Sequence, residues 1–402
     1  MNNDYDIIII GGGMVGATLA CALGGSKLRI AVVEPIPAPR QFAGEDYDIR
    51  VSAITRATQN VFAAVGAWEG MVARRVQPYG EMHVWDETGS GVIHFDSTEL
   101  GEADLGHIIE NRVILAALLD RMGDFDNIDF LCPASATGMQ LGEDRAELFL
   151  ADGRTLRAKL LVGTDGTTSW VREQAGIDST GWAYDQSAVV CTVKTSKHHQ
   201  DTAWQRFRPE GPLAFLPLPE GHSSIVWSTN HERARELCEM PASQFLDELQ
   251  VAFGDTLGRM ESVGARGAFP LRLQHADQYV KPRLALAGNA AHALHPLAGQ
   301  GLNIGVLDAA ALAEVLLNAG YKDVGSLSLL RRYERWRKGE NIAMVGAMDV
   351  FKRLFSNRST PLAWLRNAGL SLANSVAPLK HFFMRRALGT EGDLPRLAQG
   401  RR

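Results

Sequence analysis

A glycine-rich turn near the start of the chain has the residue types and spacing of a dinucleotide-binding loop. The apolar run Tyr5–Ile10 leads into the letters GGGMVG, in which Gly11, Gly13 and Gly16 have G-x-G-x-x-G spacing. In such a turn the first glycine makes the bend, the second admits a pyrophosphate, and the third lets helix and strand pack closely. Glu34 ends the next apolar run, where a carboxylate can accept both ribose hydroxyls and disfavours a 2′-phosphate. The pattern predicts FAD or NAD rather than NADP; the alternative is a glycine-rich turn without a ligand.

A second glycine turn lies in the central stretch 283–308, RLALAGNAAHALHPLAGQGLNIGVLD. A short apolar strand breaks at Gly288, and a loop then runs through Pro296 and Gly299-Gln300-Gly301 into a helix that we expect to begin near Asn303. Backbone N–H groups at a helix start lack helical partners and lie at the positive end of the dipole. They favour an electron-rich ligand such as a reduced flavin, against the alternative of an ordinary strand-to-helix turn.

Two further charged residues have candidate ligand roles. Asp165 and Gly166 follow the apolar strand Thr155–Val162, where a carboxylate can hold a ligand hydroxyl or a neighbouring loop. The alternative for Asp165 is a plain helix N-cap. Arg50 could meet a phosphate or the flavin edge, and its alternative is a surface arginine at the start of a helix, Thr55–Trp68.

Composition excludes several classes of protein. The 402 residues carry a net charge of -5, which does not suggest a nucleic-acid partner. The four cysteines form no CxxC pair and predict free thiols in a reducing compartment. His198-His199 lacks a third ligand at metal spacing, so we expect a solvated loop and no metal. The N-terminus reads as a strand rather than a signal peptide, and no apolar run suits a membrane span, so the expected compartment is the cytoplasm.

The elements that carry these residues alternate between two patterns. Buried strands and helices surround the glycine turns, whereas the region from Ser187 to Pro270 alternates apolar and polar residues, as antiparallel strands do. The predicted class is α/β, with a Rossmann-like FAD-binding domain interleaved with an antiparallel-sheet substrate domain, plus C-terminal helices. The expected ranges are 1–75, 105–180 and 275–345 for the FAD-binding domain, 76–104 and 181–274 for the substrate domain, and 346–402 for the helical region.

Aromatic residues of the alternating region are candidates for a substrate site. Phe215, Pro217 and Trp227 could line a hydrophobic aromatic site, and core packing is the alternative. Towards the C-terminus, Leu327–Phe355 predicts a basic amphipathic helix that includes Arg337. The region Leu362–Leu388 interleaves apolar and basic residues, as a membrane-surface or partner helix does, and docking on the protein's own core is its alternative.

Three separated motifs together resemble a known family. GGGMVG with Glu34, GTDGTTSWVR, and the central stretch are similar to the single-component FAD-dependent aromatic hydroxylases, which have the fold of para-hydroxybenzoate hydroxylase. The run from His295 to Asn303, ending at Asp308, resembles the ubiquinone-biosynthesis hydroxylases, most closely the 2-polyprenylphenol hydroxylase branch. The likeness extends over nearly the whole chain.

The resemblance implies cofactor roles for particular residues. Gly11, Gly13, Gly16 and Glu34 would hold the ADP half of FAD, Arg50 and Asn111 would approach the pyrophosphate, ribityl chain or ring, and Asp165 and Gly166 would form a second dinucleotide motif. The residues implied to cradle the isoalloxazine are Gly299, Gln300, Gly301, Leu302 and Asn303, and Pro296 is implied as a further cofactor-binding residue. One departure is Asn289, which stands where the family usually has aspartate; the amide keeps an acceptor but loses the charge.

The resemblance also implies a reaction. FAD reduced by NAD(P)H or another donor would react with O2 to give a C4a-hydroperoxide, which hydroxylates a polyprenylated phenol in ubiquinone biosynthesis. No catalytic base is identifiable, and His292, His295 and Pro296 are weak candidates, with structural roles as the alternative. Other substrates compatible with the motifs are a later methoxylated precursor or a small soluble phenol, and a non-catalytic flavin-binding subunit is a further alternative. The implied partners are the phenol, O2 and a ubiquinone-biosynthesis complex. Peripheral contact of the protein with the inner membrane is also implied.

Overall fold

The computed structural model describes residues 4–39, 42, 47–87, 89, 91–293, 301–320, 322–355, 380–381, 384–385 and 388–400, with the backbone alone from 344 to 355. The predicted cradle and catalytic residues His295, Pro296, Gly299 and Gln300 lie outside these ranges, as does most of Leu362–Leu388.

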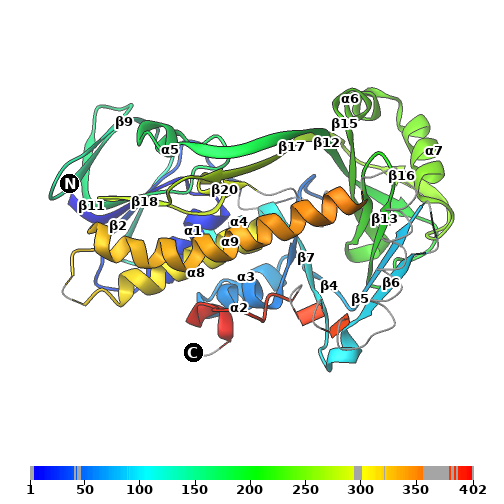
Figure 1. Cartoon of the computed structure of the whole chain (residues 1–402), viewed down its shortest axis with the longest axis horizontal. Helices are drawn as coiled ribbons and strands as arrows, with labels where there is room; N and C mark the ends of the chain where they lie inside the picture. Colours follow the sequence, from blue (N-terminus) through cyan, green and yellow to red (C-terminus); the bar gives the residue numbers. More distant parts are fainter. Residues whose placement is uncertain are drawn as a thin grey trace.

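The first sheet is built around a buried parallel core (Figure 1). Its strands follow the order β18-β19-β11-β1-β2-β8, and β9 and β10 attach to β11 as an antiparallel extension. The neighbours from β19 to β8 are parallel, and the isoleucine run of β1 is buried, as expected for a strand covered on both faces. The strands are β1 Asp4–Ile10, β2 Ile30–Val33, β8 Ile128–Leu131, β9 Ala136–Leu141, β10 Ala146–Leu150, β11 Thr155–Gly163, β18 Val280–Lys281 and β19 Leu284–Leu286.

Strand β1 is the point at which the strand order reverses. It has β2 on one side and β11 on the other, and in open α/β sheets a ligand binds outside the carboxyl ends of the strands at such a point. The carboxyl ends of β1, β11 and β19 lead into Gly11, Thr164 and Gly288. Helix α1 Met14–Leu23 follows β1 and packs against α4 Asn111–Met122 and α8 Gly301–Leu317. Gly11, Thr164 and Gly288 are therefore gathered at one edge of the sheet.

The second sheet has nine strands in the order β20-β17-β12-β15-β14-β13-β5-β6, with β16 added to β12. All its described pairs are antiparallel except β13 with β5, which is parallel. The 17-residue strand β12 and its partner β17 belong to this sheet, and they run side by side back towards the first sheet (Figure 1). The strands are β5 Glu81–Asp86, β6 Val92–Asp96, β12 Ser179–Thr195, β13 Thr202–Phe207, β14 Leu213–Pro217, β15 His222–Asn230, β16 Met260–Val263, β17 Gly267–Ala276 and β20 His292–Ala293.

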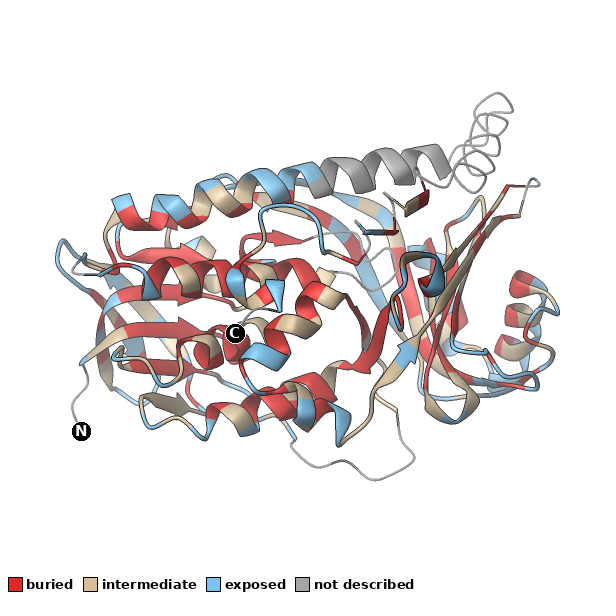
Figure 2. Ribbon diagram, turned by 90° about the horizontal axis from the view of Figure 1, so that it is seen from below, coloured by how far each residue is buried: buried red, intermediate tan, exposed pale blue. Residues whose placement is uncertain are grey.

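Different layers cover the two faces of this sheet. Helices α6 His231–Glu239 and α7 Ala242–Phe253 bury one face in an apolar cluster. The other face packs against a small sheet ordered β3-β7-β4, with strands Val51–Ile54, Gly106–Glu110 and Gln77–Tyr79. Strand cores are buried and exposed residues concentrate on turns and outer helix faces (Figure 2). The predicted α/β class, with a mostly parallel sheet beside an antiparallel-sheet partner, is confirmed.

Two local predictions need correction. The helix expected from Thr55 to Trp68 is two helices, α2 Arg56–Ala64 and α3 Trp68–Val72, because Gly66 adopts a φ of +79° between them. His199 is not in a solvated loop: it is 1% exposed, and its Nε2 lies 2.8 Å from the Leu218 carbonyl oxygen. Desolvation by burial lowers the pKa of this imidazole, so the neutral form is favoured.

The described C-terminal residues dock on the protein. The Leu388 carbonyl accepts a hydrogen bond from the Ala57 N–H in the first turn of α2, and Asn60 donates to the Ala398 carbonyl. Lys380 is buried and pairs with Glu99. Helix α9 Leu327–Phe355 has the predicted bounds, and none of the described helices is long and apolar enough to cross a membrane.

Candidate cofactor site

The turn between β1 and α1 requires glycine at two positions and leaves space at a third. Gly11 has a φ of +103°, and a Cβ there would lie 2.7 Å from the Thr164 carbonyl oxygen. A Cβ on Gly16 would lie 2.0 Å from the Gly11 carbonyl oxygen. At Gly13 a Cβ would meet no protein atom within 4 Å. Gly11 and Gly16 are thus needed for packing, whereas the bare side of Gly13 lets a ligand approach the backbone, which fits the pyrophosphate of FAD.

Glu34 lies beside this turn. Its Oε2 accepts a hydrogen bond of 2.7 Å from the Gly12 N–H, and its Oε1 accepts one of 3.0 Å from the Ile36 N–H. The carboxylate is therefore held at the carboxyl edge of the sheet, next to the end of β1. This placement fits the predicted contact with an adenosine ribose.

Asp165 holds a neighbouring loop. Its Oδ2 accepts from the Val171 N–H at 3.0 Å and its Oδ1 from the Ser169 hydroxyl, and Ser169 itself caps the short helix α5 Trp170–Gln174. The next residue, Gly166, has a φ of +87° and would have no atom within 4 Å of a Cβ. The backbone of Gly166 is therefore accessible to a ligand, whereas the side chain of Asp165 is already hydrogen-bonded within the protein.

Arg50 and Asn111 are brought together from distant parts of the sequence. The Asn111 N–H donates to the Arg50 carbonyl oxygen at 3.0 Å, and the Asn111 Oδ1 accepts from the Ser52 hydroxyl at 2.7 Å. The Arg50 side chain is exposed, with its guanidinium 5.2 Å from the centre of the Phe269 ring in β17. Arg50 therefore stands where the first region meets the second sheet.

Glu110 is a residue of this edge that the sequence reasoning missed. The carboxylate is buried and accepts from Arg75 Nε at 2.7 Å, Arg112 Nε at 2.9 Å and the Asp48 N–H at 2.6 Å. It thereby fixes the segment that leads into Arg50. The available signal was an acid at the end of the otherwise apolar strand β7, because a buried carboxylate needs cationic or N–H partners.

Residues of the central stretch split between buried and exposed positions. Asn303 is buried; its Oδ1 accepts from the Thr55 N–H at 3.1 Å, and its Nδ2 donates to the Ala53 carbonyl at 2.8 Å. The side chain ties the first turn of α8 to the start of α2. A Cβ on Gly301 would meet no described atom within 4 Å, Leu302 is half-buried, and Asn289 is exposed in the 3-10 turn η3 Gly288–Ala290.

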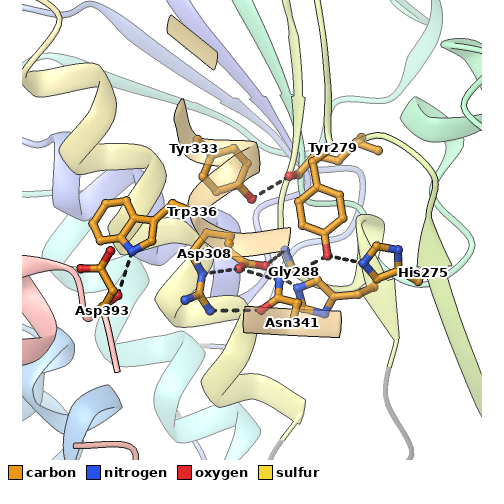
Figure 3. A network of polar contacts seen from close by, with 11 residues as sticks. His275, Tyr279, Gly288, Asp308, Tyr333, Trp336, Asn341 and Asp393 are labelled. Carbon is orange, nitrogen blue, oxygen red and sulfur yellow. Dashed lines mark hydrogen bonds and ion pairs between the residues drawn. The ribbon is translucent and has the colours of Figure 1, made fainter. Parts of the chain in front are cut away.

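Asp308 is the centre of a buried polar network (Figure 3), and His292 is one of its partners. His292 Nε2 pairs with Asp308 Oδ2, and the other Asp308 oxygen accepts from Arg337 Nε at 2.9 Å. Burial alone would raise the pKa of the Asp308 carboxyl, but His292 and Arg337 outweigh that effect and lower this pKa from 3.8 to about 2. The burial of His292 and this pairing fit the structural role that is the alternative to catalysis.

The Asp308 carboxylate gives a testable acid dependence of stability. Because its folded pKa lies below the unfolded value, its contribution is present above about pH 4 and is lost as the pH falls towards 2. That contribution is on the order of 2 kcal/mol. Urea unfolding at stepped pH should give a shallower loss of unfolding free energy for Asp308→Asn than for the wild type, and the exposed control Asp126→Asn should keep the wild-type slope. Equal slopes for all three proteins would contradict the ionised, paired carboxylate.

The residues predicted to line an aromatic substrate site face the helices instead. Phe215 is 0% exposed with its ring centre 4.0 Å from that of Phe253 in α7, and Trp227 packs on Phe245 of the same helix. Pro217 has the same parity on β14 and is also buried. Side chains alternate along a strand, so these odd positions point towards α6 and α7 and away from the small sheet. Core packing, the alternative reading, is what the structure has for Phe215 and Trp227.

The sequence did not single out the opposite face of β14, which carries Leu216 and continues to Leu218. Leu216 and Leu218 cluster with Ala53 and Ile108 of the small sheet, and the Ala53 carbonyl accepts from Asn303 at the start of α8. Parity is visible in the sequence, but the choice of face requires knowing where α7 packs.

In the described part of the chain, Glu81, His94 and Asp96 come within metal-binding distance of one another. They are partly exposed on a hairpin, and Asp96 already accepts from Thr98, so we assign no metal there.

Comparison with known proteins places this edge in context. Residues 4–346 match the family described as FAD binding domain. The chain is 39% identical over 400 residues to the ubiquinone hydroxylase UbiL of Rhodospirillum rubrum, covering 98% of this chain and 92% of that protein. It is 38% identical over 390 residues to 3-demethoxyubiquinol 3-hydroxylase of Escherichia coli, covering 96% and 99%. The solved structure of p-nitrophenol 4-monooxygenase from Pseudomonas putida aligns with a TM-score of 0.79 over 96% of this chain and 99% of that one, at 19% identity, which shows the shared fold.

Proposed function

The chain belongs to the FAD-binding family of aromatic monooxygenases that includes the hydroxylases of ubiquinone biosynthesis, and we propose that its substrate is a phenol ring bearing a polyprenyl tail. The observation that carries this proposal is the near full-length similarity to ring hydroxylases of that pathway, combined with glycine turns gathered at one sheet edge. It is an FAD-dependent enzyme of ring hydroxylation. The proposal concerns which ring it accepts.

The residues at the edge divide the work of holding the cofactor. The bare side of Gly13 would admit the pyrophosphate, and Glu34 would accept the ribose hydroxyls. Gly301 and Leu302 at the start of α8 would face the isoalloxazine, with Asn303 fixing that turn to Ala53 and Thr55. When bound and reduced, by NAD(P)H in our proposal, FAD supplies the chemistry that activates O2.

The second sheet would supply the substrate side. Arg50 and Phe269 lie against each other where the two regions meet, and Phe269 keeps 37% of its surface exposed. A cation beside an apolar ring suits a phenol, whose hydroxyl is polar and whose ring and tail are apolar. The protein must hold that ring in place and exclude water. Among the described residues, His292 is 2% exposed and its Nε2 pairs with Asp308, so we do not assign it as the base.

One alternative substrate is supported by a specific observation. The Escherichia coli relative at 38% identity is named for hydroxylation of demethoxyubiquinol, a later and more substituted ring. Both candidate substrates carry the polyprenyl tail and a ring hydroxyl, so the residues named above do not distinguish between them. The two substrates differ only in the additional substituents on the ring.

The experiment is a product screen on the purified holoenzyme. We expect hydroxylated product by mass spectrometry from a polyprenylated phenol, with O2 consumption that depends on the phenol and on NADH or NADPH. Product only from demethoxyubiquinol would move the enzyme to the later step, and product only from phenols without a tail would overturn the prenyl assignment. Bound FAD without phenol-dependent O2 consumption would favour a non-catalytic flavin subunit.

Peripheral membrane contact and membership of a biosynthetic complex are parts of the same proposal. A prenylated substrate is insoluble in water, so an enzyme that meets it at the bilayer surface has easier access. The sequence of Leu362–Leu388, which mixes apolar and basic residues, supports such contact. Flotation of the full chain with anionic liposomes, compared with neutral ones, tests this part separately from catalysis.

A further inference from the structure

Asp308 lies in the middle of α8 with no exposed surface, yet it is not used to bind the cofactor in any role described above. Groups from three other elements donate to its carboxylate. The Gly288 N–H reaches Oδ2 at 3.2 Å, His292 of β20 pairs with the same oxygen, and Arg337 and Asn341 of α9 donate to Oδ1 at 2.9 and 3.1 Å (Figure 3). One carboxylate therefore joins the end of β19, the start of β20, α8 and α9.

The sequence had placed Arg337 among the basic residues of an amphipathic helix. In the structure Arg337 is 3% exposed, unlike the exposed Arg331, Arg332 and Arg335 of the same helix. Helix α9 also bonds the strand on the near side of the turn, because the Tyr333 hydroxyl donates to the Leu286 carbonyl at 2.8 Å. Helix α9 thus contacts the chain just before Gly288 directly, through Tyr333 and Leu286. It is linked to Gly288 itself through Asp308.

The Gly288 turn is wedged against the first turn of α1. Gly288 has a φ of +60°, and a Cβ there would lie 3.0 Å from Val15 Cγ2. A Cβ on Gly305 of α8 would lie 2.8 Å from the same methyl group. Val15 stands between Gly13 and Gly16, so a displacement of the Gly288 turn would press on the loop proposed to hold the pyrophosphate. Packed interiors transmit such displacements because they contain little free volume.

We propose that Asp308 is a positioning residue for the cofactor, which holds the Gly288 turn against Val15 and so fixes the spacing between the Gly288 turn and the turn that contains Gly11, Gly13 and Gly16. Arg337 and Asn341 act as its brace from α9. The inference rests on FAD binding at this edge and is independent of which phenol is hydroxylated. A buried ion pair is a weak source of stability compared with apolar packing, so an ionic cluster at this position is better explained by the geometry it imposes.

A second buried arginine supplies a matched control. Arg283, at the other end of β19, is 7% exposed, pairs with Asp323 and donates to the Glu143 and Lys159 carbonyls. It lies at the amino end of the strand, away from the carboxyl edge of the sheet where we propose that FAD binds. Arg→Lys at either position keeps the charge but loses the fork geometry, so both variants should lower the unfolding temperature of the apoprotein.

The test compares FAD affinity in Arg337→Lys, Arg283→Lys, Asn341→Ala and Asp308→Asn, measured by quenching of FAD fluorescence on titration into deflavinated protein. We expect FAD to bind roughly tenfold more weakly to Arg337→Lys, the effect of losing one charge-assisted hydrogen bond at the site. Asn341→Ala should lie between this variant and the wild type. The affinity of Arg283→Lys should stay within about twofold of the wild type, a difference below 0.5 kcal/mol.

The visible circular dichroism of bound flavin provides a readout that general destabilisation does not alter. We expect it to change in Arg337→Lys and to stay unchanged in Arg283→Lys. If Asp308→Asn does not fold, the comparison of the two lysine variants decides. Equal FAD affinities and equal flavin spectra in those two variants would overturn the proposal, whereas failure to hydroxylate a prenylated phenol with normal FAD affinity would count against the proposed substrate alone.

Discussion

Replacing Gly13 with valine is expected to give a protein that is purified without colour, yet unfolds at the same temperature as wild-type apoprotein. A side chain at this position meets no protein atom within 4 Å, and the backbone there, with a φ of -68° and a ψ of -176°, is extended and open to any residue. The new methyl groups would instead occupy the space through which the pyrophosphate reaches the first turn of α1. We expect FAD to bind at least about a hundredfold more weakly, a loss of roughly 2.7 kcal/mol.

Gly16→Ala is the control, because its defect should be of the opposite kind. Its Cβ would lie 2.0 Å from the Gly11 carbonyl oxygen, so the apoprotein itself must shift and unfold at a lower temperature. Calorimetry of both apoproteins and FAD titration of both variants separate the two effects. Wild-type FAD affinity in Gly13→Val would show that the pyrophosphate does not pass this position, and the assignment of the β1–α1 turn would be wrong.

Gly13 illustrates which parts of the site the sequence could predict. The turn, the strand before it and the helix after it are contiguous, so their geometry follows from local spacing and from the missing Cβ atoms. The same holds for Glu34, which ends the next strand of the same βαβ unit. The central stretch was recognised as a helix start for the same local reason, and α8 begins at Gly301, two residues before the expected Asn303.

Contacts between distant segments were not predictable from spacing. Glu110 and Asp308 are single acids in apolar stretches, and nothing near them in the sequence names Arg75 or Arg337 as partners. A buried carboxylate is unfavourable unless a cation or an N–H group pairs with it. Which cation does so depends on the packing of α9 and of the segment before β4. Asp165 shows the converse: its partners Ser169 and Val171 lie close by in the sequence at one helix start, and a contact with a neighbouring loop is one of the two roles that the sequence predicts for it.

The choice of face on the second sheet is the clearest case of missing information. Alternation along β14 correctly divides Leu213, Phe215 and Pro217 from Ala214 and Leu216, but a period of two does not say which set faces the cofactor. Large aromatic residues suggested a ligand site. They turned out to fill the space between the sheet and α7, whose apolar residues Phe245, Leu249 and Phe253 need partners of that size.

Phe215→Ala is therefore expected to lower stability strongly without changing substrate recognition. The side chain is fully buried and lies against Phe253, so truncation removes apolar contact and leaves a cavity in the core. Such losses cost about 3–5 kcal/mol. The measurement is the free energy of unfolding in urea, together with the KM for the phenol at a temperature at which the variant is still folded, and we expect the KM to stay within about twofold of the wild type, a difference of less than 0.5 kcal/mol.

Leu216→Ala, one position along the same strand, is the matched comparison. It also removes a buried side chain, but from the cluster that contains Ala53, whose carbonyl accepts the amide of Asn303 at the start of α8. We expect Leu216→Ala to lower stability by about 2–5 kcal/mol and, in addition, to weaken FAD binding or raise the KM for the phenol. The reverse pattern, with a raised KM in Phe215→Ala, little loss of stability and no kinetic change in Leu216→Ala, would mean that the aromatic face of β14 is the one that meets the substrate. It would also mean that the helix-covered cluster opens when the phenol binds.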